Sequence, residues 1–332
     1  EITNNKVSVH YLSELDSDAV IDVLIEKIKN QKSKIKNLPA GASVKAGQES
    51  NISIKRRVQK NIYINTVNKI REHIKRGDIY EMNYCQEFYA ENAIIDPLGV
   101  YLKLNELSPM PFSCFYRLGD KYLLSASPER FLKKQGNKII SQPIKGTIRR
   151  GNNKTENEIL KLQLKNDIKE QSENVMIVDL VRNDLSRIAK AGSVKVDELF
   201  GIYAFKQLNQ MISTVSAELK DGINFTDIIK ATFPMGSMTG APKVRAMELI
   251  EQYEQTKRGL FSGSVGYITP EGDFDFNVVI RSILYNAADH YLSFMVGSAI
   301  TYDSVPEKEY DECLLKAEAM LKALGATSKN LQ

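Results

Sequence analysis

The chain has 332 residues, of which 42% are hydrophobic, so it can bury a large core as one large domain or two ordinary ones. Its 45 basic and 41 acidic residues give a formal charge of +4, and the basic excess near the N-terminus is not interleaved with aromatic residues, which argues against nucleic-acid binding. Three widely spaced cysteines without a CxxC motif argue against a disulfide framework and a structural zinc site: Cys85, Cys114 and Cys313.

No segment of the sequence resembles a membrane anchor. No apolar run approaches the roughly 18 residues that a membrane-spanning helix needs, and no signal peptide is visible. The chain begins at Glu1 without an initiator Met, so residues upstream have been removed or are not shown. We therefore expect a cytoplasmic protein that does not bind membranes.

Residues 1–60 are predicted to form an N-terminal remnant or linker packed on a main domain. Residues 17–29 show the pattern of an amphipathic helix, and residues 30–60 are polar and rich in lysine. Helical periodicity then extends over residues 58–76, where Gly77 and Asp78 end the helix. We place the main domain over residues 61–326.

Further along the chain, short strand patterns mix with helical patterns. The first half contains strand patterns and one long polar helix, with the strands at 82–88, 112–117, 122–127 and 131–133 and the helix at 157–172. The second half alternates strands at 210–218, 263–268, 275–284 and 291–296 with helices at 227–231, 244–253 and 306–324. Hairpin-like turns join several strands. This pattern favours an α+β fold with large antiparallel sheets and helices outside.

Two pairs of glutamates have the spacing of a shared helix face. Glu170 and Glu173 are three residues apart, as are Glu309 and Glu312. If the two faces meet, four carboxylates would need a cation, and a hard divalent ion such as Mg²⁺ is the natural partner. The alternative is that both faces are simply solvated, as helical glutamates usually are.

Three other features suggest contact with a small anion. Residues 234–247 lack the Gly-Lys ending of a nucleotide P-loop, but their small residues open a helix whose N–H groups suit an anion. Arg281 lies in an apolar stretch, where a guanidinium usually pairs with a carboxylate or phosphate of the protein or of a ligand. Lys145 follows a strand pattern and precedes Gly146, a setting either for a reactive amine or for an ordinary surface turn.

Six motifs, in order, resemble the chorismate-utilising enzymes: SASPERFL, PIKGT, ENVMIVDLVRNDLSRI, GSMTGAPKVRAMELI, GSVGYITPEGDFDFNVVIRS and DSVPEKEYDECLLKAEAML. This family includes anthranilate synthase component I, aminodeoxychorismate synthase component I, isochorismate synthase and salicylate synthase. The resemblance implies a four-layer α/β sandwich like that of anthranilate synthase component I, with two mainly antiparallel sheets and helices outside. It also implies binding of chorismate and Mg²⁺.

The resemblance assigns roles to individual residues. Glu173 and Glu312 match the metal ligands of the family, and Glu170 and Glu309 match the supporting pair. The residues that match positions holding the substrate are Gly146, Thr147, Thr239, Tyr267, Arg281, Gly297, Ser298, Ala299 and Lys316.

Lys145 indicates which subgroup the chain resembles. Members that make anthranilate typically have alanine there, whereas aminodeoxychorismate synthases have a lysine that attacks C2 of the ring and expels the C4 hydroxyl before ammonia adds at C4. Glu129 matches the proposed general acid and base. Because the attacking amine must be neutral, we expect the site to lower the pKa of Lys145 from its reference of about 10.4.

The predicted activity is therefore Mg²⁺-dependent amination of chorismate to 4-amino-4-deoxychorismate, on the route to para-aminobenzoate and folate. The chain has no glutaminase signature, so the resemblance implies ammonia from a separate glutaminase subunit in a heterodimer. One alternative is anthranilate synthase component I. Another is an inactive binding subunit, because Glu81, Gln210 and Ala299 stand where the family commonly has Gln, His and Gly.

Overall fold

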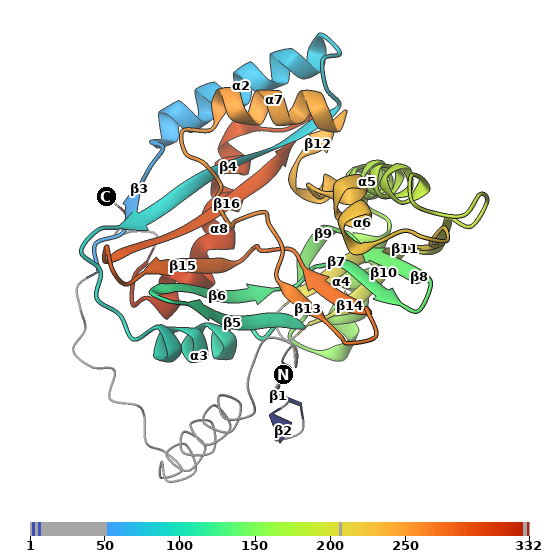
Figure 1. The fold of residues 1–332 in the computed structure, drawn as a ribbon. Coiled ribbons are helices and arrows are strands. Elements are labelled where there is room, and N and C mark those ends of the chain that lie inside the picture. Colours follow the sequence, from blue (N-terminus) through green and yellow to red (C-terminus); the bar gives the residue numbers. More distant parts are fainter. Residues whose placement is uncertain (1, 4–5, 8–51, 206–207, 328–330, 332) are drawn as a thin grey trace, which may run out of the picture. The chain divides into compact units, whose positions relative to one another are not determined.

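The computed structural model describes residues 2–3, 6–7, 52–205, 208–327 and 331 (Figure 1). The chain divides into two compact units, one of residues 1–49 with 268–273 and one of residues 50–267 with 274–332. In the first unit, β1 (Ile2–Thr3) pairs antiparallel with β2 (Lys6–Val7). The helix predicted at 17–29 and most of the predicted linker lie outside the described residues. The larger unit contains every predicted site residue.

The larger unit begins ahead of the predicted domain boundary at residue 61. Ile54 and Val58 are each 1% exposed, and β3 (Lys55–Arg56) pairs antiparallel with β4 (Glu81–Ala90). Residues 52–60 therefore belong to this unit, because two buried apolar side chains anchor the end of the polar stretch 30–60 that suggested a linker.

The first of two seven-stranded antiparallel sheets has the order β12-β4-β16-β15-β6-β5, with β3 attached to β4. Its other strands are β12 (Gly240–Ala241), β16 (Tyr291–Ile300), β15 (Ser282–Asn286), β6 (Lys121–Ser127) and β5 (Phe112–Leu118). The helices whose side chains share its core are α2 (Lys60–Lys75), α3 (Pro97–Leu107), α7 (Lys243–Tyr253) and α8 (Pro306–Ala323). Figure 1 shows α2 and α7 together near β12, and His73 of α2 contacts the Tyr253 hydroxyl of α7 at 2.9 Å.

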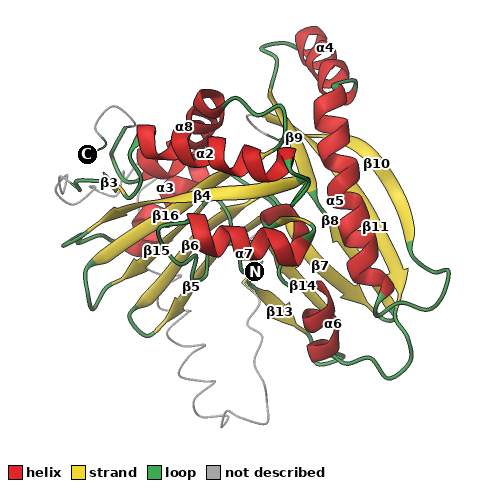
Figure 2. Ribbon diagram, turned by 90° about the horizontal axis from the view of Figure 1, so that it is seen from above, coloured by secondary structure: helices red, strands yellow, loops and turns green. Residues whose placement is uncertain are grey.

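The second sheet has the order β10-β11-β8-β7-β14-β13, with β9 attached to β11. Its strands are β10 (Lys195–Ala204), β11 (Leu208–Glu218), β8 (Lys138–Gln142), β7 (Arg130–Gln135), β14 (Phe274–Asn277), β13 (Gly266–Ile268) and β9 (Ile144–Arg149). The helices of this half are α4 (Lys154–Lys165), α5 (Ile168–Ser186), α6 (Phe225–Thr232) and the 3-10 turn η1 (Gly236–Met238). Figure 2 shows α5 running along this sheet.

Two separate cores meet at β4 and β16, because successive side chains of a strand point to opposite faces. Tyr84 and Phe294 belong to the core shared with α2 and α8. Cys85 and Met295, the next residues along, belong to the core shared with α5 and the second sheet. The two antiparallel sheets with helices confirm the predicted α+β sandwich. Among the described helices, none is both long and apolar enough to cross a membrane.

Most predicted elements are present, but two of them, one helix and one strand, are each divided into two elements. The helix expected at 157–172 is two helices, because the Asp167 side chain accepts a hydrogen bond from the Glu170 N–H at 3.0 Å and so begins α5 anew. The strand expected at 275–284 is also interrupted. It is divided between β14 in the second sheet and β15 in the first, with Arg281 between them at a φ of 52°.

Gly240 holds the start of β4 against the loop before α7. It has a φ of 151°, and a Cβ at this position would lie 2.2 Å from the carbonyl oxygen of Glu81 and 2.9 Å from Cα of Met82. The flanking backbone bonds run from Tyr80 N–H to the Ala241 carbonyl at 2.7 Å and from Asn83 N–H to the Thr239 carbonyl at 2.8 Å. A side chain at Gly240 would therefore separate the two segments.

We predict that Gly240→Ala destabilises the protein more than Gly222→Ala. At Gly222 the φ is 79° and a Cβ would meet nothing within 4 Å, so alanine there costs only the backbone strain of about 1–2 kcal/mol. At Gly240 the collision with β4 adds about 1–3 kcal/mol. Urea unfolding of both variants measures the difference, and equal losses of unfolding free energy would contradict the proposed close approach.

Candidate active site

A cavity of about 570 Å³ in the larger unit is lined by residues of both sheets and of two helices. The first sheet contributes Asn83 of β4 and Ala299 of β16, and the second contributes β9 and the end of β11. α5 and α8 supply acidic side chains. Because the lining combines buried backbone with many charged groups, this cavity suits a small, multiply charged ligand.

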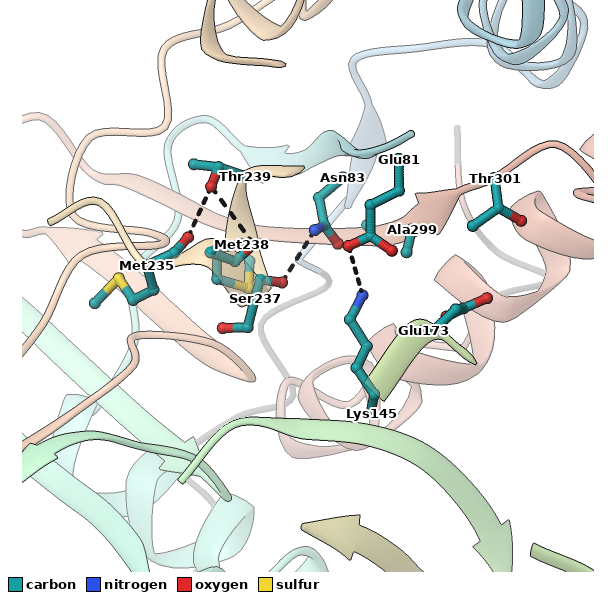
Figure 3. A network of polar contacts seen from close by, with 12 residues as sticks. Glu81, Asn83, Lys145, Glu173, Met235, Ser237, Met238, Thr239, Ala299 and Thr301 are labelled. Carbon is teal, nitrogen blue, oxygen red and sulfur yellow. Dashed lines mark hydrogen bonds and ion pairs between the residues drawn. The ribbon is translucent and has the colours of Figure 1, made fainter. Parts of the chain in front are cut away.

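Lys145 lies on β9 and extends into this cavity. Its side chain is 10% exposed, and its Nζ lies 3.5 Å from Oε1 of Glu81, which has no exposed side-chain surface (Figure 3). The following Gly146 has a φ of 91°, and a Cβ there would lie 3.1 Å from Oε2 of Glu170. The glycine thus lets β9 turn close to α5, and the Lys145 amine is enclosed rather than solvated, which rules out an ordinary surface turn.

The charge state of Lys145 differs from the sequence-based expectation. Burial lowers the pKa of its amine, but the carboxylates of Glu81, Glu173, Glu129 and Glu312 raise it, and their combined effect is larger. The pKa therefore lies above its ordinary value, so the expectation of a lowered pKa is wrong for the ligand-free protein. Sequence reasoning considered burial and nearby cations, whereas the actual neighbours are acids.

Glu129 is a buried acid at the turn between β6 and β7. It is 4% exposed, and burial raises its pKa to about 7, although the Ser237 side chain, Lys145 and the Ile144 backbone act in the opposite direction. A carboxyl group with this pKa can donate or accept a proton near neutral pH, which is the property that its predicted role requires, and the role stays a prediction.

The two predicted acidic pairs line the same cavity, from α5 and from α8. Glu309 is 4% exposed. Burial, followed by the charge of Glu173, raises the pKa of Glu170 to about 7. Burial also raises the pKa of Glu312. Lys316, at 2.6 Å, and other nearby lysines have the opposite and larger combined effect, so the pKa of Glu312 lies below its ordinary value. The two pairs therefore share one site and are not two separate solvated helix faces.

These carboxylates do not form a ready-made metal centre. Within residues 52–205 and 208–327, no three His, Cys, Asp or Glu side chains are grouped so that they could hold a metal ion. Lys316 pairs with Glu312, and Lys169 lies 3.8 Å from Glu173. An all-carboxylate donor set fits a hard ion such as Mg²⁺ in its chemistry, and metal binding stays a prediction.

Six of the nine predicted substrate-binding residues line the cavity: Gly146, Thr147, Arg281, Gly297, Ala299 and Lys316. Arg281 is the most informative of these, because its guanidinium forms no hydrogen bond or ion pair with any other described residue. Burial lowers its pKa, and only Glu312 acts against this. A partly buried guanidinium that has no side-chain partner among the described residues is suited to a carboxylate of a ligand.

The other three predicted substrate-binding residues do not line the cavity. Ser298 points to the opposite face of β16 from Gly297 and Ala299, and its hydroxyl contacts the Tyr63 hydroxyl at 3.2 Å. The Thr239 hydroxyl donates to the Met235 carbonyl at 2.9 Å (Figure 3). Tyr267 is 46% exposed on β13. Direct contact with a ligand in this cavity is therefore not supported for these three.

Sequence reasoning missed one cation, Lys169, and did not explain Gln210 and Glu81, two of the three departures from the family pattern. Lys169 is adjacent to the acidic pair of α5 and its pKa is raised, because Glu173, Glu309, Glu170 and Glu312 outweigh the effect of burial. Gln210 lines the cavity and is 2% exposed, and its Oε1 has no hydrogen-bond partner within the described part of the chain. Glu81 faces Lys145. A lysine beside helical acids is common on solvated helices, so no sequence signal distinguishes Lys169.

Comparison with known proteins gives relatives of two activities. The chain is 39% identical over 258 residues to aminodeoxychorismate synthase component 1 of Bacillus subtilis, covering 78% of this chain and 54% of that protein. It is 36% identical over 325 residues to anthranilate synthase component 1 of the same organism, covering 98% of this chain and 61% of that protein. The chain thus spans little more than half the length of these two relatives.

Two solved structures are similar to this chain in fold. The fold superimposes on anthranilate synthase component I from Streptococcus pneumoniae with a TM-score of 0.79 and 30% identity, covering 93% of this chain and 67% of that one. The isochorismate synthase MenF from Escherichia coli, at 18% identity and a TM-score of 0.72, shares the fold. Residues 8–322 match the family described as chorismate binding enzyme. The chain therefore belongs to the chorismate binding enzyme family.

Proposed function

We propose that the chain is an aminodeoxychorismate synthase component I, which aminates chorismate at C4 with ammonia and forms 4-amino-4-deoxychorismate. The single observation that carries this proposal is the enclosed amine of Lys145 on the wall of the charged cavity. An amine can act as a covalent nucleophile where acids and bases surround it and bulk water is kept away. Relatives with this name, such as the one from Bacillus subtilis, support the proposal.

Binding of the substrate would use the charges of the cavity. Arg281, which lacks a partner among the described residues, would pair with one carboxylate of chorismate. When Mg²⁺ is bound, Glu173 and Glu312 would hold it with the support of Glu170 and Glu309, and it would neutralise the ring carboxylate and favour loss of the C4 hydroxyl. Gly297 and Ala299 leave room beside β16 for the ring.

The covalent step would use Lys145 and Glu129. The Lys145 nitrogen, once neutral, bonds to C2 of the ring while the bond between C4 and its hydroxyl oxygen breaks. Glu129, whose pKa is raised to about 7 by burial, gives its proton to the departing hydroxyl, which leaves as water. Ammonia then bonds to C4 and the bond between C2 and Lys145 breaks, which restores the lysine.

The source of ammonia is proposed to be a separate glutaminase subunit. The relatives are named component 1, which implies a second component for those proteins. We extend this to a heterodimer here. Free ammonium should replace the partner in the experiments below.

Anthranilate synthase component I is the second candidate, because relatives with that name are similarly close at 36% and 38% identity. The two functions place nitrogen at different ring carbons. Incubation with chorismate, Mg²⁺ and ammonium, followed by mass spectrometry and fluorescence, distinguishes them. Formation of fluorescent anthranilate would refute the first proposal, and absence of any product would favour an inactive binding subunit.

We predict that Lys145→Ala abolishes amination at C4, because the proposed covalent step needs the Lys145 amine as its nucleophile. Lys138→Ala is the matched control, since Lys138 lies on neighbouring β8 with a side chain that is 53% exposed. Liquid chromatography of the product over time measures both variants. Near-normal turnover by Lys145→Ala would defeat the covalent role.

We predict that turnover falls as the pH rises through about 7, because Glu129 must carry its proton to release the hydroxyl and its raised pKa sets the midpoint. Glu129→Gln should lower the maximal rate by about 10²–10⁴-fold and remove this decline. Rates are compared at equal concentrations of free ammonia at every pH. A wild-type pH profile in Glu129→Gln would exclude Glu129 as the acid.

We predict that Glu173→Gln and Glu312→Gln raise the Mg²⁺ concentration needed for half-maximal turnover, because each removes a charged ligand. Glu307→Gln is the matched control, since Glu307 is an exposed acid in the first turn of α8. Turnover is titrated with Mg²⁺ for all three. If both cavity variants respond to Mg²⁺ like the control, the assignment of the metal ligands is wrong.

A further inference from the structure

Glu81 is a buried carboxylate that the proposed mechanism has not used. It is the first residue of β4, its side chain is 0% exposed, and neither of its oxygens has a hydrogen-bond partner among the described residues. The only ion pair that the described part of the chain gives it is with Lys145, at 3.5 Å. Burying a charged carboxylate without hydrogen bonds costs free energy of folding. The charge of Lys145 is the one nearby interaction that offsets this cost among the described residues.

The position of Glu81 is set by backbone contacts on both sides of it. Tyr80 and Asn83 donate backbone hydrogen bonds to the loop before α7, and Gly240 lies against the Glu81 carbonyl without room for a side chain. Lys145 reaches the carboxylate from β9 of the other sheet, as Figure 3 shows. The backbone of Glu81 is therefore fixed against the loop before α7, and its buried carboxylate faces the Lys145 amine.

We infer that Glu81 is the positioning residue of Lys145, holding its amine at the cavity wall and accepting its proton when the nitrogen becomes a nucleophile. This inference rests on the proposed function for its role in turnover. The pairing itself rests only on the burial and geometry of the two side chains. It explains why a carboxylate is useful here, at a position that the family resemblance left unexplained.

The proton balance of the proposed sequence is complete. One proton moves from the Lys145 ammonium to the Glu81 carboxylate, which leaves a neutral amine and a neutral carboxyl group. The amine nitrogen forms a bond to ring carbon C2, the C4–oxygen bond breaks, and the Glu129 proton leaves with the hydroxyl as water. When ammonia has displaced the lysine, the amine is released neutral and takes its proton back from Glu81. The nitrogen that has bonded to C4 carries one proton more than an amine, and giving that proton to Glu129 restores the acid for the next turnover.

Four carboxylates face Lys145 from four different elements: Glu81 on β4, Glu129 before β7, Glu173 on α5 and Glu312 on α8. Burial lowers the pKa of Lys145 and each of these acids raises it, with Glu81 first among them. Removing the charge of Glu81 should therefore lower the pKa of Lys145. A lower pKa makes the Lys145 amine neutral more often, which by itself would speed its attack. If Glu81 also accepts the Lys145 proton, removing the Glu81 carboxylate should nevertheless slow turnover.

The experiment compares Glu81→Gln, Glu81→Asp and a control, Glu87→Gln. Glu87 lies on the same strand and is 7% exposed, but it pairs with Arg57. The pH dependence of Lys145 acetylation by acetic anhydride, followed by peptide mass spectrometry, reports the Lys145 pKa without chorismate. Turnover of chorismate with ammonium is measured in parallel, and urea unfolding checks that each variant is folded.

We expect Glu81→Gln to move the midpoint of Lys145 labelling down by about 1–3 pH units and to reduce turnover by about 10²–10⁴-fold. Glu81→Asp should give a labelling midpoint and a turnover rate between those of the wild type and Glu81→Gln. Glu87→Gln should leave the midpoint and the rate unchanged. An unchanged labelling midpoint in Glu81→Gln would overturn the pairing. A lowered midpoint with unchanged or faster turnover would overturn the role as proton acceptor.

The outcome is separable from that of the proposed function. If the wild-type protein makes anthranilate or no product, the proposed function fails, and labelling of Lys145 still decides whether Glu81 is its partner. If Glu81→Gln does not fold, the labelling midpoint and the turnover are measured in Glu81→Asp instead. Aspartate keeps the negative charge, but its shorter side chain lengthens the distance to the Lys145 amine. Wild-type values for both measurements in Glu81→Asp would then refute the inference.

Discussion

The ion pair between Lys145 and Glu81 is the interaction on which the rest of the site depends. It joins β9 of the second sheet to β4 of the first, at the wall of a cavity where several other carboxylates raise one another's pKa. Two buried charges at 3.5 Å stabilise each other, whereas either one alone would be costly. The cavity can hold an excess of acids because Lys145, together with Lys169 and Lys316, supplies compensating positive charge.

The same two strands, β4 and β16, contribute to a hydrophobic core and to the cavity. β4 and β16 place alternate side chains on opposite faces, so one face packs against α2 and α8 while the other faces the cavity. The same alternation explains why Gly297 and Ala299 line the cavity and Ser298 does not. A glycine against Cys85 also lets these two strands approach, since a Cβ at Gly297 would lie 2.4 Å from the cysteine sulfur. Packing and ligand binding therefore share the same two strands.

Sequence patterns predicted elements best where periodicity was long and uninterrupted. Examples are α2, which ends before Gly77 as expected, and α8, which extends over Pro306–Ala323. They failed where a tertiary contact breaks a continuous pattern. The Asp167 cap divides one expected helix, and the passage of the chain from one sheet to the other at Arg281 divides one expected strand. α3 was missed, although Asp96 followed by Pro97 is a recognisable helix start.

By itself, the sequence determined the α+β class, the family resemblance, the two acidic pairs and the identity of Lys145 as the residue of interest. These properties reside in residue types and in their spacing along the chain. Only the tertiary structure decided which residues surround that lysine. The pKa of a side chain depends on burial and on charges within a few ångströms, and Lys145 meets Glu81, Glu129, Glu173 and Glu312 only because two sheets and two helices converge on one cavity. The direction of its pKa shift, opposite to the one expected, follows from that convergence.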